Sequence, residues 1–186
     1  YENKIITIIN KPTGISVHGG YKNKNNIIRI IKNLKNNKYI ELIHRLDMNT
    51  SGCLMLLKSF VMLQTLNNKL KENKIIKIYH LLCNGNIKKN VHIYVKIYKN
   101  KNLKVIYNSL TRFSTIKLYN KYSLLEAIPY TGKKHQIRIH LNKIKHPIIN
   151  DIKYMNNKLI NYIKIKNYKK IFLHSKKMKL ICPLSH

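Results

Sequence analysis

The stretch His44-Arg-Leu-Asp-Met-Asn-Thr-Ser-Gly52 is the most chemically unusual part of the sequence. It places an imidazole, a guanidinium and a carboxylate between two apolar segments, and it ends in Thr-Ser-Gly, which favours a turn. A polar loop that joins two buried strands can hold a reactive group rigidly and still leave it accessible. Asp47 is therefore a candidate catalytic carboxylate. From residue type alone, the simpler interpretation is that its side-chain oxygens only cap the turn.

A second cluster, Thr131-Gly-Lys-Lys-His-Gln-Ile-Arg-Ile-His140, gathers cationic and amide side chains in a segment with helical spacing. His135, Arg138 and Asn142 recur at intervals that bring them near one another on a helix. Arginine is rare in this chain, because only four of the 37 basic residues are Arg. Arg138 therefore indicates a need for the planar fork of donors that a guanidinium supplies. A solvated basic face is the alternative interpretation.

A third candidate, Lys77-Ile-Tyr79, lies in the middle of a predicted strand. Because side chains alternate along a strand, Tyr79 shares a face with Lys77 and Leu81. Tyrosine is common here, with 13 copies, so a tyrosine that only packs in the core is the simpler interpretation.

The elements that must position these clusters follow from hydrophobic periodicity and turn residues. Strands are predicted at 5–9, 41–43, 53–57, 75–83, 91–97, 114–118, 123–128, 171–174 and 178–182. Helices are predicted at 25–34, 59–70 and 134–145. The Lys- and Asn-rich stretch 156–170 is expected to be an exposed loop. Together they predict an α+β fold, a single domain over 1–186 with a largely antiparallel mixed sheet flanked by a few helices.

The charge is strongly one-sided, since 37 Lys and Arg oppose six Asp and Glu, for a formal net charge of +31. Such a chain repels itself unless a polyanion is near, so RNA or DNA is the expected partner. Codon bias in an AT-rich genome would also enrich Lys, Asn, Ile and Tyr, so charge alone does not decide the function. The six acids are Glu2, Glu41, Asp47, Glu72, Glu126 and Asp151. They are too few and too scattered for a metal-dependent nuclease, which needs several clustered acids to hold its metal ions.

The three cysteines, Cys53, Cys83 and Cys182, are isolated in apolar surroundings. They form no Cys-x-x-Cys pair and no Cys/His cluster at zinc-ligand spacing, so free thiols are the expected state. No apolar run approaches membrane-spanning length, and no signal peptide opens the sequence. We expect no metal, no membrane partner, and an intracellular location in the cytoplasm or an organelle.

Together these segments resemble the RluA-type pseudouridine synthases, in the right order along nearly the whole chain. Asn10-Lys-Pro-Thr-Gly14 is similar to the opening turn of that family, and His44-Arg-Leu-Asp47 with Thr50-Ser-Gly52 to the motif of its catalytic aspartate. Lys77-x-Tyr79 is similar to the strand that presents its tyrosine, and His135-Gln-Ile-Arg138 with His140 to its basic motif. His146-Pro-Ile-Ile149, Asp151 and Tyr154 continue the pattern.

The resemblance implies isomerisation of specific uridines to pseudouridine in structured RNA, rRNA or tRNA, by base flipping. It implies that Asp47 is the essential carboxylate, that Arg138 pairs with it, and that Tyr79 stacks on the base. Contacts with RNA or substrate are implied for His44, Arg45, Lys77, Lys133, His135 and Gln136. It further implies an active-site cleft across the sheet, no cofactor, no metal and a monomer.

The sequence departs from the family pattern at a few loop positions. Lys133 stands where Arg is usual, and Lys145, Asn150 and Met155 stand where Gly is usual. None of these departures touches the three catalytic candidates. A non-catalytic basic RNA-binding protein with the same fold is the alternative, and a degenerate synthase is another. No N-terminal RNA-binding domain of the kind the family often carries is expected in this sequence.

Overall fold

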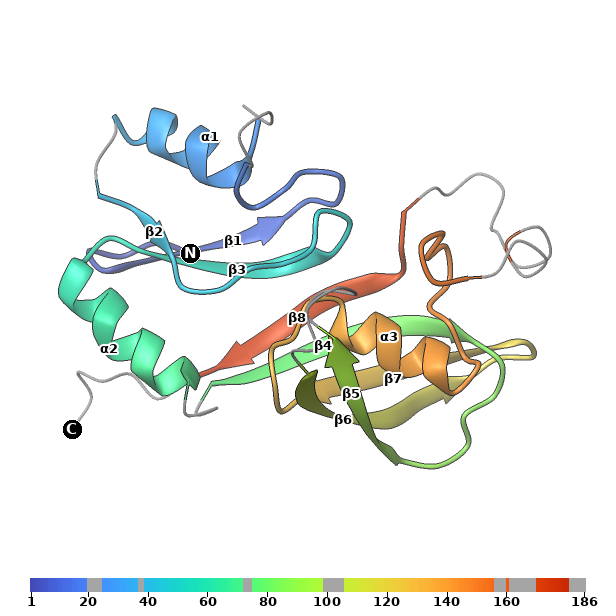
Figure 1. Cartoon of the computed structure of the whole chain (residues 1–186). Coiled ribbons are helices and arrows are strands. Elements are labelled where there is room, and N and C mark those ends of the chain that lie inside the picture. The colour runs from blue at the N-terminus through green and yellow to red at the C-terminus, as the bar shows by residue number, and fades with distance from the viewer. Residues whose placement is uncertain are drawn as a thin grey trace. The chain divides into compact units, whose positions relative to one another are not determined.

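The structure, a computed structural model, describes residues 1–19, 25–36, 39–71, 75–98, 106–155, 160 and 170–180 (Figure 1). The chain forms two compact units, Tyr1–Ile75 with His174–His186, and Ile76–Leu173. Both units combine strands with helices, and most of the described strand pairs are antiparallel, which confirms the predicted α+β class. None of the helices among the described residues is long and apolar enough to cross a membrane.

The first unit is built around β3 (Ser51–Leu57), whose Leu54–Leu57 run is buried. β1 (Ile6–Lys11) pairs with it antiparallel over its whole length, and the short β2 (Glu41–Leu42) pairs antiparallel with its end. β8 (Leu173–Lys179) runs parallel to it at Ser51 and Gly52. This arrangement puts residues 43–50 in a connection between β2 and β3, as the sequence predicted.

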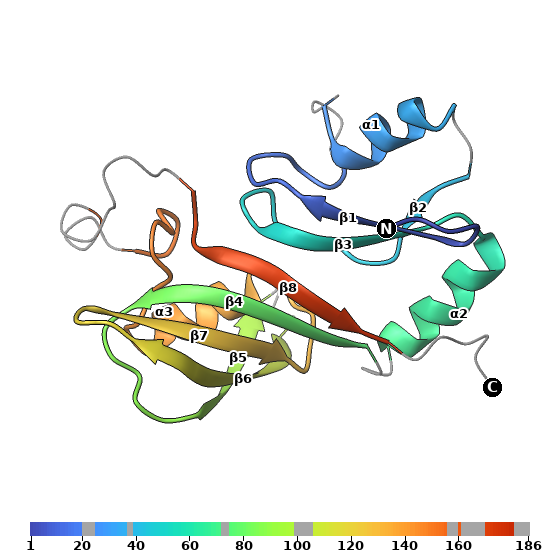
Figure 2. The same cartoon turned by 180° about the vertical axis from the view of Figure 1, so that it is seen from behind.

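Side-chain caps fix where the two helices of this unit begin. α1 (Ile27–Leu34) follows Asn26, whose Oδ1 accepts a hydrogen bond from the Arg29 amide at 3.1 Å. α2 (Phe60–Lys71) follows Ser59, whose Oγ accepts from the Met62 amide at 3.4 Å. Both helices flank the strands β1–β3 in Figures 1 and 2. One core cluster of the unit contains the buried residues Ile43, Met55, Leu57, Leu66 and Ile75.

The second unit is an antiparallel sheet with strand order β4-β7-β6-β5. The strands are β4 (Ile76–Asn84), β5 (Val91–Tyr98), β6 (Ile106–Leu118) and β7 (Tyr122–Pro129). α3 (Gln136–Lys143) packs against this sheet, and β4 and β7 lie behind the helix in Figure 1 and in front of it in Figure 2. Phe113, Leu125, Ala127 and Leu141 are fully buried in the core of this unit.

Polar groups inside the second unit attach α3 to β6. His140 of α3 is fully buried, and its Nε2 lies 2.8 Å from the Ser109 hydroxyl of β6. Burial lowers the pKa of His140 to about 4, so the ring is neutral at neutral pH. The Ser109 hydroxyl also donates to the Val95 carbonyl, and it therefore accepts from Nε2 of the neutral ring.

The structure corrects three of the predicted elements. β6 begins at Ile106 and not at 114, because Ser109 and Thr111 interrupt the apolar pattern while being buried under α3. The two strands predicted at 171–174 and 178–182 are one strand, β8. α3 begins at Gln136 and not at 134, because His135 has a left-handed backbone with φ 56°. Most of the predicted loop 156–170, and Cys182, lie outside the described residues.

Cys53 and Cys83 are free thiols, as predicted. Burial raises the pKa of both, that of Cys83 to about 12, so neither thiol is ionised at neutral pH.

Gly52 has two separate reasons to be glycine. Its φ is +108°, and a Cβ at this position would overlap the backbone carbonyl of Ser175 in β8. We expect Gly52→Ala to lower the free energy of unfolding by about 2 kcal/mol or more, measured by urea unfolding. Gly14→Ala is the matched control, because Gly14 has φ +87° but open space around its missing Cβ. Equal losses in the two variants would contradict the close approach of β8 as a cause.

Candidate active site

The Asp47 side chain stands on the loop between β2 and β3 and is partly buried. A turn closes the loop, since the Thr50 amide donates to the Asp47 carbonyl at 3.0 Å. His44 lies at the start of the same loop, where its Nε2 accepts from the Met55 amide at 3.2 Å. The neutral ring therefore carries its proton on Nδ1. Arg45 is exposed, as an RNA contact would need to be.

The Asn10–Gly14 turn holds the backbone that follows Asp47. The Gly14 amide and the Lys11 ammonium both donate to the Met48 carbonyl, at 2.9 Å and 3.0 Å. The Thr13 hydroxyl donates to the Asn49 carbonyl at 2.9 Å. Two segments 30 residues and more apart in the sequence are thus joined by three hydrogen bonds, which fixes the position from which the carboxylate projects.

Lys11 is the central residue of this clamp, and its side chain is 0 % exposed. Its ammonium donates to the carbonyls of Pro12 at 2.7 Å and Ile15 at 2.8 Å, besides that of Met48. Burial lowers the pKa of Lys11 to about 8, and the negative charge of Asp47 opposes that shift. The protonated lysine thus places a positive charge within electrostatic reach of the candidate catalytic carboxylate.

The lowered pKa of Lys11 predicts a pH dependence of stability. Between the folded value of about 8 and the ordinary value of 10.5, the unfolded chain holds more protons, so stability rises with pH. We expect the free energy of unfolding of the wild type, relative to Lys11→Met, to rise from pH 8 to pH 10 by an amount on the order of 1–3 kcal/mol. Lys4→Met, which removes an exposed lysine of the same unit, serves as the control. A flat difference between wild type and Lys11→Met would contradict the burial of the charged amine.

In the second unit, Arg138 makes a bidentate ion pair with Asp151. Its Nε and Nη2 each lie 2.7 Å from one carboxylate oxygen. Arg138 is 8 % exposed and Asp151 is 2 % exposed, so the pair is shielded from water. The fork geometry that made Arg138 stand out in the sequence is thus used in the structure. The resemblance gave Asp151 no role, and the pairing of Arg138 with Asp47 that it implied stays a prediction.

Tyr154 completes a cluster around this pair. Its hydroxyl lies 2.8 Å from Nδ1 of His135, and the two rings meet edge to face. The Arg138 guanidinium carbon lies 5.0 Å from the centre of the Tyr154 ring, which is cation–π distance. The left-handed backbone of His135 turns the chain at the start of α3.

Gln136 is buried, and its amide is fully used inside the protein. Its Oε1 accepts from the Thr131 hydroxyl and the Lys133 amide, at 2.7 Å and 3.0 Å. Its Nε2 donates to the Leu110 carbonyl and the Thr111 hydroxyl, both at 3.0 Å. Gln136 therefore fastens the start of α3 to β6, with both amide protons engaged.

The remaining predicted residues of this unit lie near the loop before α3 or in the sheet. The Lys77 ammonium lies 3.5 Å from the place where a Cβ on Gly132 would stand, and burial lowers the pKa of Lys77. The Lys133 ammonium lies 4.3 Å from the centre of the Tyr107 ring. Tyr79 is buried in β4 and pairs across the sheet with Ala127.

Sequence reasoning missed the roles of Lys11, Asp151 and Tyr154, although all three stood inside the quoted motifs. Asp151 had a usable signal, because it is one of only two aspartates in a chain with six acids. Lys11 had none, since one lysine among many gives no hint of burial. Among the described residues, no group of three or more His, Cys, Asp or Glu side chains could hold a metal ion.

Comparison with known proteins agrees with these motifs. Residues 5–143 match the family model described as RNA pseudouridylate synthase. The chain is 37% identical over 195 residues to "Ribosomal large subunit pseudouridine synthase C" of Buchnera aphidicola subsp. Baizongia pistaciae, covering 98% of this chain and 62% of that protein. The protein of the same name from Buchnera aphidicola subsp. Acyrthosiphon pisum is 40% identical over 196 residues, again covering 98% and 62%. This chain thus spans less than two thirds of the length of either relative.

The fold is shared with a solved structure, "Human RNA Pseudouridylate Synthase Domain Containing 1". The TM-score is 0.80 at 20% identity, and the match covers 100% of this chain and 78% of that one. At this identity the likeness concerns the fold alone. The match to the family model, together with the two bacterial relatives, shows that the chain belongs to the RNA pseudouridylate synthase family.

Proposed function

We propose that this protein isomerises specific uridines to pseudouridine in the RNA of the large ribosomal subunit. Family membership and the names of the two bacterial relatives support the reaction and the RNA class. The observation that carries the proposal is the clamped Asp47 loop, in which Lys11, Thr13 and Gly14 hold the backbone beside the carboxylate. If the Asp47 side chain only capped the turn, its loop would not need a buried ammonium to hold it in place.

The reaction breaks the bond between ribose C1′ and uracil N1 and forms a bond from C1′ to C5. C5 releases its hydrogen as a proton, and N1 takes up a proton. We propose that the ionised Asp47 carboxylate acts at the ribose carbon, either as a nucleophile or by stabilising its developing positive charge. We further propose that Arg138 and Tyr79 act on the same uridine, with Tyr79 stacked on the base.

We propose that the other predicted residues either contact the RNA or hold catalytic elements in position. Arg45, Lys77 and Lys133 are proposed as cations for RNA phosphates, and His44 and His135 as contacts near the uridine. Gln136 is proposed as a positioning residue for α3, because both of its amide protons are already engaged. We propose that the chain works as a monomer without metal or cofactor, since the isomerisation transfers no electrons and no group from a second molecule.

The test is release of tritium from unmodified transcripts labelled with [5-³H]uridine. Large-subunit ribosomal RNA is the expected substrate, with small-subunit ribosomal RNA and transfer RNA as comparisons. Mapping of pseudouridine after chemical labelling would then give the position. Release only from another RNA would overturn the substrate class. No release from any RNA, with tight binding retained, would favour a non-catalytic RNA-binding protein.

A further inference from the structure

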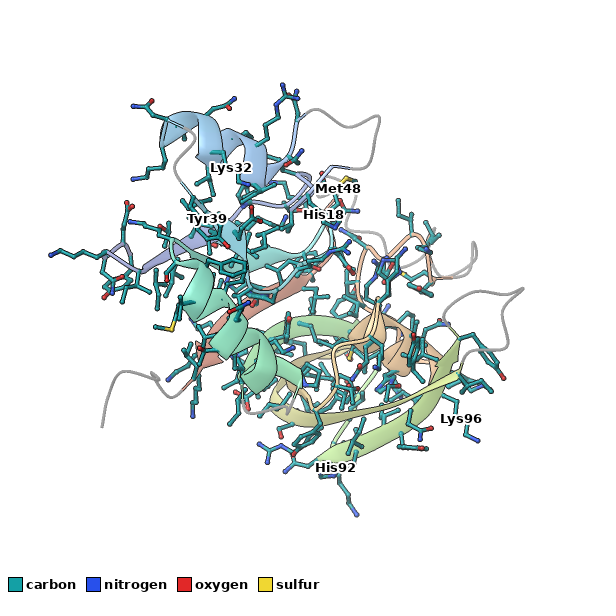
Figure 3. All side chains as sticks on the ribbon, turned by 60° about the vertical axis from the view of Figure 1, so that its left-hand side comes forward. His18, Lys32, Tyr39, Met48, His92 and Lys96 are labelled. Carbon is teal, nitrogen blue, oxygen red and sulfur yellow. The ribbon has the colours of Figure 1, made fainter. Side chains whose placement is uncertain are left out.

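One face of β5 exposes a row of tyrosines and cations. His92, Tyr94, Lys96 and Tyr98, here called the β5 row, are all exposed, and they alternate with the buried or partly buried Val91, Ile93, Val95 and Ile97. Tyr94 is 58 % exposed and Tyr98 is 62 % exposed, which is unusual for rings of this size. His92 and Lys96 project outward from the strand in Figure 3. Nothing in the described residues of this unit covers the row.

The β5 row lies on the face of the sheet away from α3. Ile93 pairs with Thr111 and Val95 pairs with Ser109, and these two β6 side chains bond to Gln136 and His140 of α3. The odd-numbered residues of β5 therefore face the helix, and the row faces the opposite side. The row also lies at a sheet edge, because β6 is the only described strand that pairs with β5.

The surroundings of the row are positive. Arg112 of β6 lies opposite His92, and its buried Nε has no hydrogen-bond partner. Neither β5 nor β6 contains an acidic residue. The acid on this face of the described sheet is Glu126 of β7, and its carboxylate lies 4.0 Å from Nε2 of His80. An anionic ligand would thus meet Lys96 and Arg112 without opposing charge from the two strands beneath it.

We propose that the β5 row binds an extended, single-stranded segment of the substrate RNA, outside the part that holds the uridine. Exposed rings beside cations form the stacking platforms that hold single strands with little sequence preference. Tyr94 and Tyr98 stand four residues apart on the strand, about 14 Å. Stacked bases are about 3.4 Å apart, so two bases on these rings belong to an unstacked strand and not to a duplex. The inference rests on the proposed function only in taking RNA as the partner.

The test compares ring removal in the row with ring removal elsewhere in the same unit. The variants are Tyr94→Thr, Tyr98→Thr and the double variant, in which threonine keeps a residue suited to a strand. Tyr119→Thr is the matched control, because Tyr119 is 44 % exposed just after β6 and outside the row. The probes are a fluorescein-labelled 12-nucleotide single-stranded RNA of mixed sequence and a duplex of the same length. Thermal unfolding shows that each variant is folded.

We expect the double variant to bind the single strand at least about 10-fold more weakly, and the duplex within about two-fold of wild type. Tyr119→Thr should match wild type with both probes. Unchanged binding of the single strand by the double variant would overturn the proposal. The proposal would also be overturned if sedimentation velocity showed that the wild type is a dimer and the double variant a monomer. In that case a second copy of the chain, and not RNA, would occupy the row.

Tritium release separates this inference from the proposed function. With wild-type release present, the double variant should raise KM for ribosomal RNA about 10-fold and leave kcat unchanged. A lower kcat with unchanged KM would overturn the row as a binding surface. Weaker single-strand binding by the double variant, with no tritium release by wild type, would uphold the row and overturn only the proposed function.

Discussion

Asp47→Asn is expected to abolish tritium release from RNA, with kcat lowered by at least about 10³-fold and RNA affinity within about two-fold of wild type. In the proposed reaction the carboxylate supplies the negative charge at the ribose carbon, and asparagine carries no such charge. Asparagine is nearly the same size and caps turns as well as aspartate does. The loop, which Lys11 and Gly14 hold through the Met48 carbonyl, should therefore stay in place.

The substitution separates the two interpretations that the sequence left open for Asp47. If the side chain only capped the turn, asparagine would preserve activity. Asn49→Ala is the control, since it alters an exposed side chain in the same loop and leaves the backbone carbonyl to Thr13. Loss of activity in both variants would point to damage of the loop. Retained activity in Asp47→Asn would contradict the catalytic role.

The periodic and capped elements could be predicted from the sequence because local chemistry determines them. Asn26 and Ser59 cap their helices, and the continuous apolar run of β3 is a buried strand. β6 was only half predicted, since Ser109 and Thr111 look like surface residues until α3 satisfies their hydroxyls. His135 looked helical, and only its left-handed backbone shows that α3 starts at Gln136, two residues later than predicted.

Candidate site residues could be predicted from the sequence where their residue type is rare in this chain, and were missed where it is common. Arg138 was noticed because arginine is scarce, and its planar fork is indeed used. Lys11 could not be noticed, because burial of one lysine depends on carbonyls brought together from positions 12, 15 and 48. The spacing of residues along the chain does not show that these carbonyls come together around Lys11. The burial of Lys11 becomes visible only once β1 and β3, which carry the two loops, are paired in the structure.

Asp151→Ala is expected to lower the free energy of unfolding by about 3–5 kcal/mol, because it removes the carboxylate that accepts from both Nε and Nη2 of the buried Arg138 guanidinium. Urea unfolding at pH 7 measures the loss. Glu126→Ala is the control, since Glu126 is a partly exposed acid of the same unit, 4.0 Å from His80. Its loss should be within about 1 kcal/mol. Equal losses in the two variants would contradict the buried pair.

The double variant Arg138→Met/Asp151→Ala tells whether Arg138 is needed for the reaction or only for the fold. Removing both charges also removes the cost of burying a guanidinium that has lost the Asp151 carboxylate, so most of the lost stability should return. Tritium release should stay at least about 10²-fold below wild type, because no guanidinium remains to act on the uridine. Recovery of both stability and activity would make the pair structural. Recovery of stability alone would assign the guanidinium to the chemistry and Asp151 to holding it in place.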